Sequence, residues 1–378
     1  MRIKFQLVIL SILLLIVSCQ QYDKQDRVAK DEVVIDTQMV KILFPPGKDI
    51  LTGGDGAISI QIDDNRSFWL WGDSFLGEVV NNRRAESSPF VMGNVWQLLD
   101  GKSIKTITGG TLVSPESLLK AEKVDGYPAV LWPMHGFVKN NIVHVFMSTI
   151  VQTGKGTWDF YWHSIMYYRL NLLDLSVIDK QELLTEKQTE AHFGFGVTEH
   201  EGFYYVYGSN PQKDFTATLH VARARLRDDK LQDWEYFDGN NWLYDPKGSK
   251  ALQGIDIPIS EQFSVFRYDD KFILLTQDRF KPEVYTFTAD TPEGPWSDKK
   301  LIYTIPEGKD STLFVYNAMA HPQYGPEGKL LVSYCVNAKN IPDLYKNASI
   351  YKPRFFWISL DTVFRSPDPP VASGKPLR

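Results

Sequence analysis

Residues 54–73, GDGAISIQIDDNRSFWLWGD, contain a β-hairpin pattern that decides the fold. A short strand that begins with glycine covers Gly54–Ile62, a polar turn follows, and an aromatic strand covers Phe68–Asp73. Isoleucine, phenylalanine and tryptophan favour strands, whereas the Asp-Asp-Asn cluster between them favours a turn. The stretch therefore predicts two antiparallel strands joined by a tight connection.

The same hairpin pattern recurs four more times along the chain. The further copies occupy residues 132–148, 192–209, 261–277 and 317–336, and additional strands such as 219–226, 284–289 and 354–360 follow them. Repeated hairpin units of similar size are typical of a β-propeller, in which four-stranded blades surround a central channel. The sequence therefore predicts an all-β, five-bladed β-propeller. A β-sandwich is the alternative, although it needs fewer and longer strands.

Composition agrees with such a fold and excludes one class of partner. Aromatic residues make up 13% of the chain and are accompanied by 26 glycines and 21 prolines, which favours strands and turns over helices. The chain has 41 basic and 46 acidic residues and a net charge of -5. Because binding to phosphates requires a basic face, we expect no nucleic-acid partner.

The N-terminus has the features of an export signal. Two positive charges lie within Met1–Lys4, and residues 5–17 form an apolar run that is short for a membrane span. Residues 15–19, LIVSC, resemble the bacterial lipobox, whose cysteine is diacylated and becomes the first residue of the mature protein. The resemblance implies lipidation at Cys19 and attachment to the bacterial cell envelope, at the outer membrane or cell surface. An ordinary signal cut near Ser18 is the alternative.

These patterns divide the chain into four segments. They are a signal peptide (1–18), a flexible tether (19–40), the propeller domain (41–365) and a C-terminal tail (366–378). The tether is polar and lacks periodicity. Cys335, the other of the two cysteines, lies in an apolar strand and is left without a partner if Cys19 is acylated. We therefore expect a monomeric domain that folds without a disulfide.

Five short motifs connect the chain to a known group of propellers. They are residues 52–57 (TGGDGA), 70–75 (LWGDSF), 290–296 (DTPEGPW), 317–322 (NAMAHP) and 351–355 (YKPRF). They resemble blade motifs of five-bladed propellers that are similar to glycoside hydrolases. That group includes families of unknown function, relatives of endo-D-arabinanases and, more distantly, the arabinanase and β-xylosidase clan. The resemblance covers residues 41–360 and implies the fold and a glycan substrate, but the fold alone does not define the sugar.

Carboxylates recur on one rim of the predicted channel. When the blades are aligned by their turns, Asp55 precedes the first inner strand, Glu261 precedes the fourth, and Asp73 ends a second strand on the same rim. Glycoside hydrolysis uses two carboxyl groups, one as proton donor and one as nucleophile or base. Asp55 and Asp73 lie among glycines that let a ligand approach, although such aspartates also cap turns. Glu261 precedes the apolar run Phe263–Phe266, so we expect burial to raise its pKa towards that of a proton donor.

Other candidates for substrate binding occupy the same rim or the channel. Trp132 is placed to stack on a sugar ring. The aligned rim position is Glu190 or Ala191 in the third blade and Tyr316 or Asn317 in the fifth, and we take Glu190 and Asn317 as the candidates. His135 and His321 fall within inner strands, where a neutral imidazole can bind a sugar hydroxyl or help to hold a structural channel ion. A purely structural histidine is the alternative for both. We expect no cofactor and no catalytic metal.

The favoured function is an exported glycoside hydrolase that acts on furanosides such as arabinan with paired carboxylates at the channel mouth. The alternative is a non-catalytic lipoprotein that binds glycans at the cell envelope. Asp55 and Asp73 favour the enzyme, whereas Leu131 and Asn317 at equivalent positions indicate that not every blade contributes an acid.

Overall fold

The computed structural model describes residues 33–364, except 49, 112, 155, 157–158, 213–216, 280 and 327. Cys19, the predicted signal peptide, most of the predicted tether and the tail 366–378 lie outside the described residues. The described helices are short: α2 (Gln38–Leu43), α3 (Ile341–Lys346) and α4 (Leu360–Phe364). Within this part of the chain, no helix has the length and apolar character that a membrane crossing requires.

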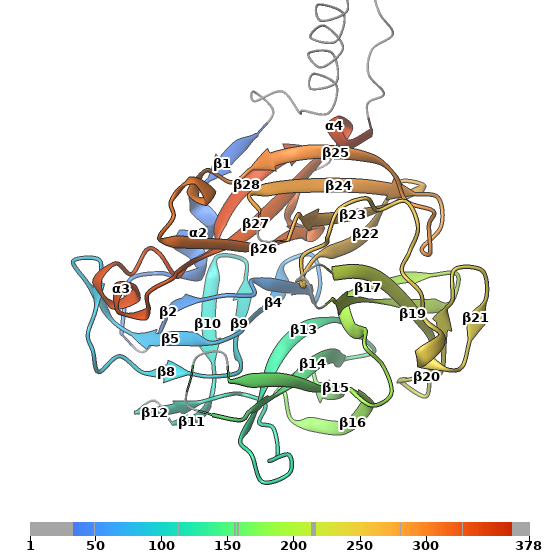
Figure 1. Cartoon of the computed structure of the whole chain (residues 1–378). Coiled ribbons are helices and arrows are strands. Elements are labelled where there is room, and N and C mark those ends of the chain that lie inside the picture. Colours follow the sequence, from blue (N-terminus) through green and yellow to red (C-terminus); the bar gives the residue numbers. More distant parts are fainter. Residues whose placement is uncertain are drawn as a thin grey trace, which may run out of the picture.

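Five antiparallel sheets form the blades, and four of them follow one another along the chain (Figure 1). From the inner strand outwards, the first blade consists of β3 (Ile58–Gln61), β4 (Arg66–Trp71), β9 (Val95–Asp100) and β10 (Ser103–Ile107), and the second of β13 (Ala129–Lys139), β14 (Ile142–Gln152), β15 (Phe160–Asn171) and β16 (Val177–Thr185). The third blade consists of β17 (His192–His200), β18 (Phe203–Pro211), β19 (Ala217–Arg227), β20 (Lys230–Phe237) and β21 (Trp242–Leu243). The fourth consists of β22 (Ser264–Tyr268), β23 (Lys271–Gln277), β24 (Glu283–Ala289) and β25 (Ser297–Thr304).

The fifth blade joins the two ends of the domain. From the inside outwards, its strands are β26 (Leu313–His321), β27 (Lys329–Ala338), β28 (Arg354–Ser359) and β1 (Val34–Asp36). Val34 pairs with Trp357 in the backbone register. The Asp36 carboxylate accepts a 2.8 Å hydrogen bond from Trp357 Nε1, and its other oxygen accepts the backbone N–H groups of Gln38 and Met39 at the start of α2. The N-terminal strand therefore closes the ring.

The inner strands of the five blades surround one channel. β13 contacts both β3 and β17, and β17 contacts β22. The ring continues from the last blade to the first, because Ser59 Oγ on β3 lies 2.7 Å from His321 Nδ1 on β26. A cavity of about 440 Å³ is lined by residues of all five blades. The all-β propeller predicted from the hairpin repeats is confirmed.

Aromatic side chains fill the space between adjacent blades. Trp69 of the first blade is fully buried, stacks on Trp71 with ring centroids 6.2 Å apart, and meets Phe355 of the last blade edge-on at 5.8 Å. Rings of this size remove a large apolar area from water, which stabilises the fold. The tryptophans in this interface therefore stabilise the contact between the first and last blades.

Three inner strands contain an irregularity at a similar level. The register between the first and second strand of a blade shifts between Pro133 and Gly136, between Phe193 and Gly196, and between Tyr316 and Met319. Such β-bulges add residues to one strand and change the direction of the side chains next to them. Residues at the start of these strands therefore do not follow a simple count from the hairpin turns.

Three small sheets lie in the segments before and between the strands of the first two blades. They consist of β2 (Ile50–Gly54), β5 (Ser74–Gly77) and β8 (Phe90–Val91); β6 (Val79–Val80) and β7 (Arg83–Arg84); and β11 (Gly109–Thr111) and β12 (Ser114–Glu116). Asp55 and Asp73 lie at one end of the first blade, and these segments begin at that same end.

Candidate active site

Asp55 lies in the connection between β2 and the inner strand β3. Its Oδ2 accepts a 2.8 Å hydrogen bond from the Tyr316 hydroxyl of the last blade. Gly72 packs against it so closely that a Cβ atom there would lie 2.5 Å from Asp55 Oδ1. The glycine therefore makes room for the carboxylate, and its N–H also donates to the Asp55 carbonyl at 2.9 Å.

Asp73 follows β4 and is held by two N–H donors. Its Oδ1 accepts hydrogen bonds from the Gly93 backbone N–H at 2.8 Å and from Trp132 Nε1 at 3.1 Å. The Trp132 ring in turn meets Phe160 edge-on at 5.3 Å. Trp132, expected to stack on a sugar, thus also orients the carboxylate. The Tyr351 hydroxyl donates to the Asp73 carbonyl at 3.0 Å.

Burial dominates the electrostatics of both aspartates. Burial and, after it, the negative charge of Asp73 raise the pKa of Asp55 from 3.8 to about 7. The hydrogen bond from Tyr316 opposes this shift because it stabilises the ionised form. Burial also raises the pKa of Asp73, against the hydrogen bonds from Gly93 and Trp132. Asp55 therefore holds its proton at pH values at which an ordinary aspartate is ionised.

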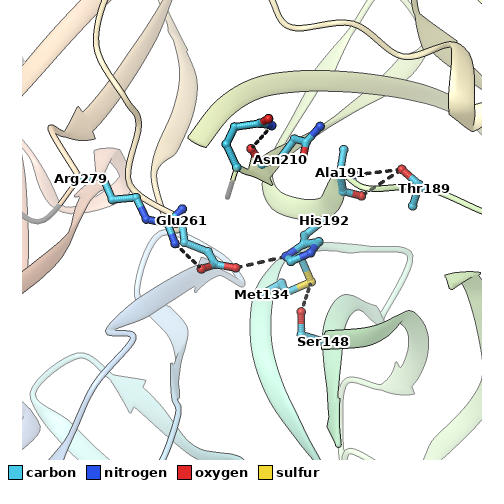
Figure 2. Close-up of polar contacts among 9 residues, drawn as sticks. Met134, Ser148, Thr189, Ala191, His192, Asn210, Glu261 and Arg279 are labelled. Atoms are coloured by element: carbon cyan, nitrogen blue, oxygen red, sulfur yellow. Dashed lines mark hydrogen bonds and ion pairs between the residues drawn. The ribbon is translucent and has the colours of Figure 1, made fainter. Parts of the chain in front are cut away.

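Glu261 precedes β22 and lies between two basic side chains (Figure 2). Its Oε1 accepts a 3.1 Å hydrogen bond from His192 Nδ1, and its Oε2 lies 3.5 Å from Arg279. The His192 ring stacks on Trp162 with centroids 4.0 Å apart, which fixes its orientation. About 40% of the Glu261 side chain is exposed. It is therefore accessible to a ligand.

The expected pKa shift of Glu261 is wrong in sign. Burial is the largest influence and does raise the pKa, as the neighbouring run Phe263–Phe266 predicted. However, the interactions with His192, foremost its hydrogen bond, and the positive charge of Arg279 together outweigh burial and lower the pKa of Glu261 below 4.5. Glu261 is thus held as a carboxylate, which does not suit a proton donor.

A short series of contacts connects Glu261 to Asp55 across the fourth, fifth and first blades. Ser260, next to Glu261, donates its hydroxyl to Asn317 Oδ1 at 3.2 Å. Asn317 adopts a left-handed backbone with φ of 55° and follows Tyr316, the partner of Asp55. The predicted rim residue Asn317 therefore lies between the two acids.

Three other candidates lie elsewhere. Glu190 is exposed on the approach to β17. His321 is fully buried, lies 2.7 and 2.8 Å from the hydroxyls of Ser59 and Ser333, and has no exposed surface through which a sugar could reach it. His135 lines the channel cavity, and burial lowers its pKa to about 4, so it is neutral. His321 therefore fits the alternative expectation of a purely structural histidine.

Among the described residues of 33–364, no group of three or more His, Cys, Asp or Glu side chains is arranged to hold a metal ion.

Three residues of this site were missed by sequence reasoning: Tyr351, His192 and Arg279. Tyr316 was named only as the alternative to Asn317. His192 precedes a bulged region of an inner strand, so counting from the turns did not single it out. Tyr351 begins the motif YKPRF, which supplied a signal without indicating a role.

Comparisons with known proteins agree with this architecture. Residues 47–360 match the family described as "Domain of unknown function (DUF5005)". No curated protein matches the chain. A solved structure described as a "putative hydrolase" from Bacteroides ovatus has a TM-score of 0.74 at 18% identity, over 90% of this chain and 93% of that chain. A GH43_1 enzyme from Xanthomonas citri, complexed with xylose, has a TM-score of 0.48 at 12% identity, over 85% and 92%. At 18% identity, the likeness to the Bacteroides ovatus protein shows a shared fold.

Proposed function

We propose a function from the site itself, because the chain belongs to the DUF5005 family, whose description assigns no activity. The proposed reaction is the hydrolysis of glycosidic bonds at the channel mouth. The observation that carries it is a pair of carboxyl groups with opposite pKa shifts, raised to about 7 for Asp55 and lowered for Glu261. Two carboxyl groups whose pKa values are shifted in opposite directions allow one site to supply both an acid and a base.

The shifts assign the roles. Asp55 holds a proton near neutral pH and donates it to the leaving oxygen as the glycosidic C–O bond breaks. Glu261 is ionised and either attacks the anomeric carbon or removes a proton from the attacking water. This assignment takes Asp55 from the predicted pair Asp55 and Asp73 as the proton donor, and it gives Glu261, which the sequence offered as a further candidate for the donor, the opposite role.

Asp73 and Trp132 support the donor. The negative charge of Asp73 raises the pKa of Asp55, and Trp132 fixes the Asp73 carboxylate through its indole N–H. The Trp132 ring, partly exposed, also offers an apolar face to a sugar. Asp73 is thus a positioning residue in this proposal.

The substrate and location are proposed from the sequence. The substrate is a glycan outside the cytoplasm, with furanosides such as arabinan as the first to be tested. The protein is a monomer, anchored to the bacterial cell envelope by a lipid on Cys19. The apolar run at residues 5–17, followed by Ser18 and Cys19, supports this location.

The test is a screen of polysaccharides, including arabinans and xylans, with released reducing sugar as the readout. On a substrate that is cleaved, Asp55→Asn and Glu261→Gln should each reduce turnover by roughly 10²-fold or more. Glu201→Gln is the matched control, because Glu201 is 81% exposed in the turn at the other end of β17. Near-wild-type turnover in both site variants would reject the assignment. A wild type that binds a glycan but never cleaves it would favour the non-catalytic lipoprotein.

A further inference from the structure

A groove of about 410 Å³ lies among loops of the first two blades. Its walls come from three segments: residues 90–92 at β8, residues 115–121 at and after β12, and residues 129–131 at the start of β13. The volume falls within the range of about 300–1,000 Å³ that is usual for ligand sites. The groove is therefore large enough to hold a small organic ligand.

Two walls of this groove also hold Asp73. Met92 lines the groove, and the next residue, Gly93, donates its N–H to Asp73. Leu131 lines it as well, and the next residue, Trp132, donates its indole N–H to the same oxygen. Both N–H donors of Asp73 thus come from residues that directly follow groove-lining residues in the chain.

The groove is built before any ligand binds, because a buried amide connects its three segments. Asn94 is fully buried and donates to the carbonyls of Leu119 at 2.8 Å and Leu131 at 3.0 Å, while its own oxygen accepts the Leu119 N–H. Ser117 donates its hydroxyl to the Met92 carbonyl at 2.6 Å. These bonds fix the walls relative to one another, which lowers the entropic cost of binding.

The chemistry of the lining suits a neutral sugar chain. Phe90 is 43% exposed and Met92 is 41% exposed, so both offer apolar surface to the C–H faces of sugar rings. The charged side chains of Glu116 and Lys120 form an ion pair with each other, which leaves no net charge for an ionic ligand.

We infer that this groove binds sugar units of the glycan on the Asp73 side of the cleaved bond, so that the preferred substrate is an oligosaccharide or polysaccharide and not a single glycoside. The inference rests on the proposed function, because it places the cleaved bond at the channel mouth. It adds a substrate class that the carboxyl groups alone do not define.

Calorimetric titration of the full protein in a Glu261→Gln background tests the groove without cleavage. The probes are neutral oligosaccharides of two to six units from arabinan, xylan, glucan, mannan and galactan. We expect affinity for at least one series to rise about tenfold or more with chain length. Met92→Ala and Phe90→Leu should remove this rise, and Phe90→Leu keeps an apolar side chain against Phe75. Leu173→Ala is the control, since Leu173 is 93% exposed in the turn after β15, at the opposite end of the second blade.

The outcomes separate the groove from the catalytic proposal. Length-dependent binding that both groove variants lose supports the groove, even if the wild type cleaves nothing, which would contradict only the hydrolase. Hydrolysis by the wild type with equal affinity for all lengths overturns the groove and leaves the hydrolase. Absence of length-dependent binding across the whole panel, or its persistence in both folded groove variants, also overturns the groove.

Discussion

The Tyr316 hydroxyl donates to Asp55 Oδ2 over 2.8 Å and thereby joins the inner strand of the last blade to the start of the first. The same hydroxyl accepts a 3.3 Å hydrogen bond from Asn337 Nδ2, so its proton is directed at the carboxylate. Asp55 and Tyr316 are 261 positions apart in sequence. The proposed proton donor therefore obtains its environment only when the ring is closed.

Removal of this hydroxyl should change the acidity of Asp55. The hydrogen bond from Tyr316 lowers the Asp55 pKa, so Tyr316→Phe should raise that pKa further above 7 and shift the alkaline decline of kcat/KM to higher pH. The measurement is a pH–rate profile on the substrate found by the screen. Tyr167→Phe is the control, because Tyr167 bonds His144 within the second blade. If kcat/KM of Tyr316→Phe declines at the same alkaline pH as that of the wild type, the hydrogen bond from Tyr316 does not lower the Asp55 pKa.

The pH dependence of the wild type follows from both acids. Asp55 must be protonated, so kcat/KM should fall roughly tenfold per pH unit above about 7. Glu261 must be ionised, and because its pKa lies below 4.5, the acidic decline should begin only below that value. The profile measured over pH 3.5–9 should thus be bell-shaped. A maximum above pH 8 is the result that the assignment does not allow.

Asp55 should also make stability depend on pH. Below pH 3.8, Asp55 holds its proton in both the folded and the unfolded state. Between pH 3.8 and about 7, Asp55 ionises only in the unfolded state, so the free energy of unfolding falls as the pH rises. Above about pH 7, Asp55 is ionised in both states, and its contribution stays constant. Asp55→Asn cannot ionise and should be more stable than the wild type at pH 8, by at most roughly 4 kcal/mol at about 1.4 kcal/mol per pKa unit. Urea denaturation at pH 4 and 8 checks this. The two proteins should differ less at pH 4, and an equal difference at both pH values would argue against a raised pKa.

Ring closure should depend on Asp36. Asp36→Ala removes the acceptor for Trp357 Nε1 and for the N–H groups at the start of α2, which should cost about 1–3 kcal/mol of unfolding free energy. Asp36→Asn retains a side-chain oxygen and should lose less. Urea denaturation of both variants gives the comparison. Equal stability of the alanine variant and the wild type would mean that this contact does not contribute to closure.

Lipidation is testable independently of activity. Cys19→Ala should abolish incorporation of radiolabelled palmitate and release the protein from the membrane fraction, because the proposed anchor depends on the thiol of Cys19. Cys335→Ala is the matched control, since this second cysteine is buried in β27. Labelling that persists in the Cys19 variant would reject the anchor.

The blades could be predicted because each hairpin is encoded by local sequence. The turn at Asn140 and the turn at Asp269 both place these residues at φ of 52°, a left-handed conformation that asparagine and aspartate adopt more readily than most residues. The strands on either side then pair with their nearest neighbour in the chain. Neither step requires information from another blade.

The electrostatics of the site could not be predicted in the same way. The run Phe263–Phe266 predicts the burial of Glu261, which raises its pKa. The interactions that lower this pKa come from His192 at the start of β17 in the third blade and from Arg279, which follows β23. The alignment left Tyr316 and Asn317 as alternatives for one position, and it could not decide between them because a bulge between Tyr316 and Met319 changes the register. Contacts between blades join residues that are far apart in the sequence and meet only in the closed ring. The local pattern of a single sequence therefore does not predict them.

The position of β1 has a mechanical consequence. Any tension that an anchor at Cys19 transmits along the chain reaches the folded domain at Val34–Asp36, which pairs only with the outer edge of β28. Terminal strands of this length fray at low free-energy cost. Under load, this outermost strand should detach first, while β27 and β28 still separate the pulled edge from β26 and its Tyr316. The strand nearest to the proposed anchor is thus the outermost strand of the last blade, and the contact between Tyr316 and Asp55 lies three strands further in.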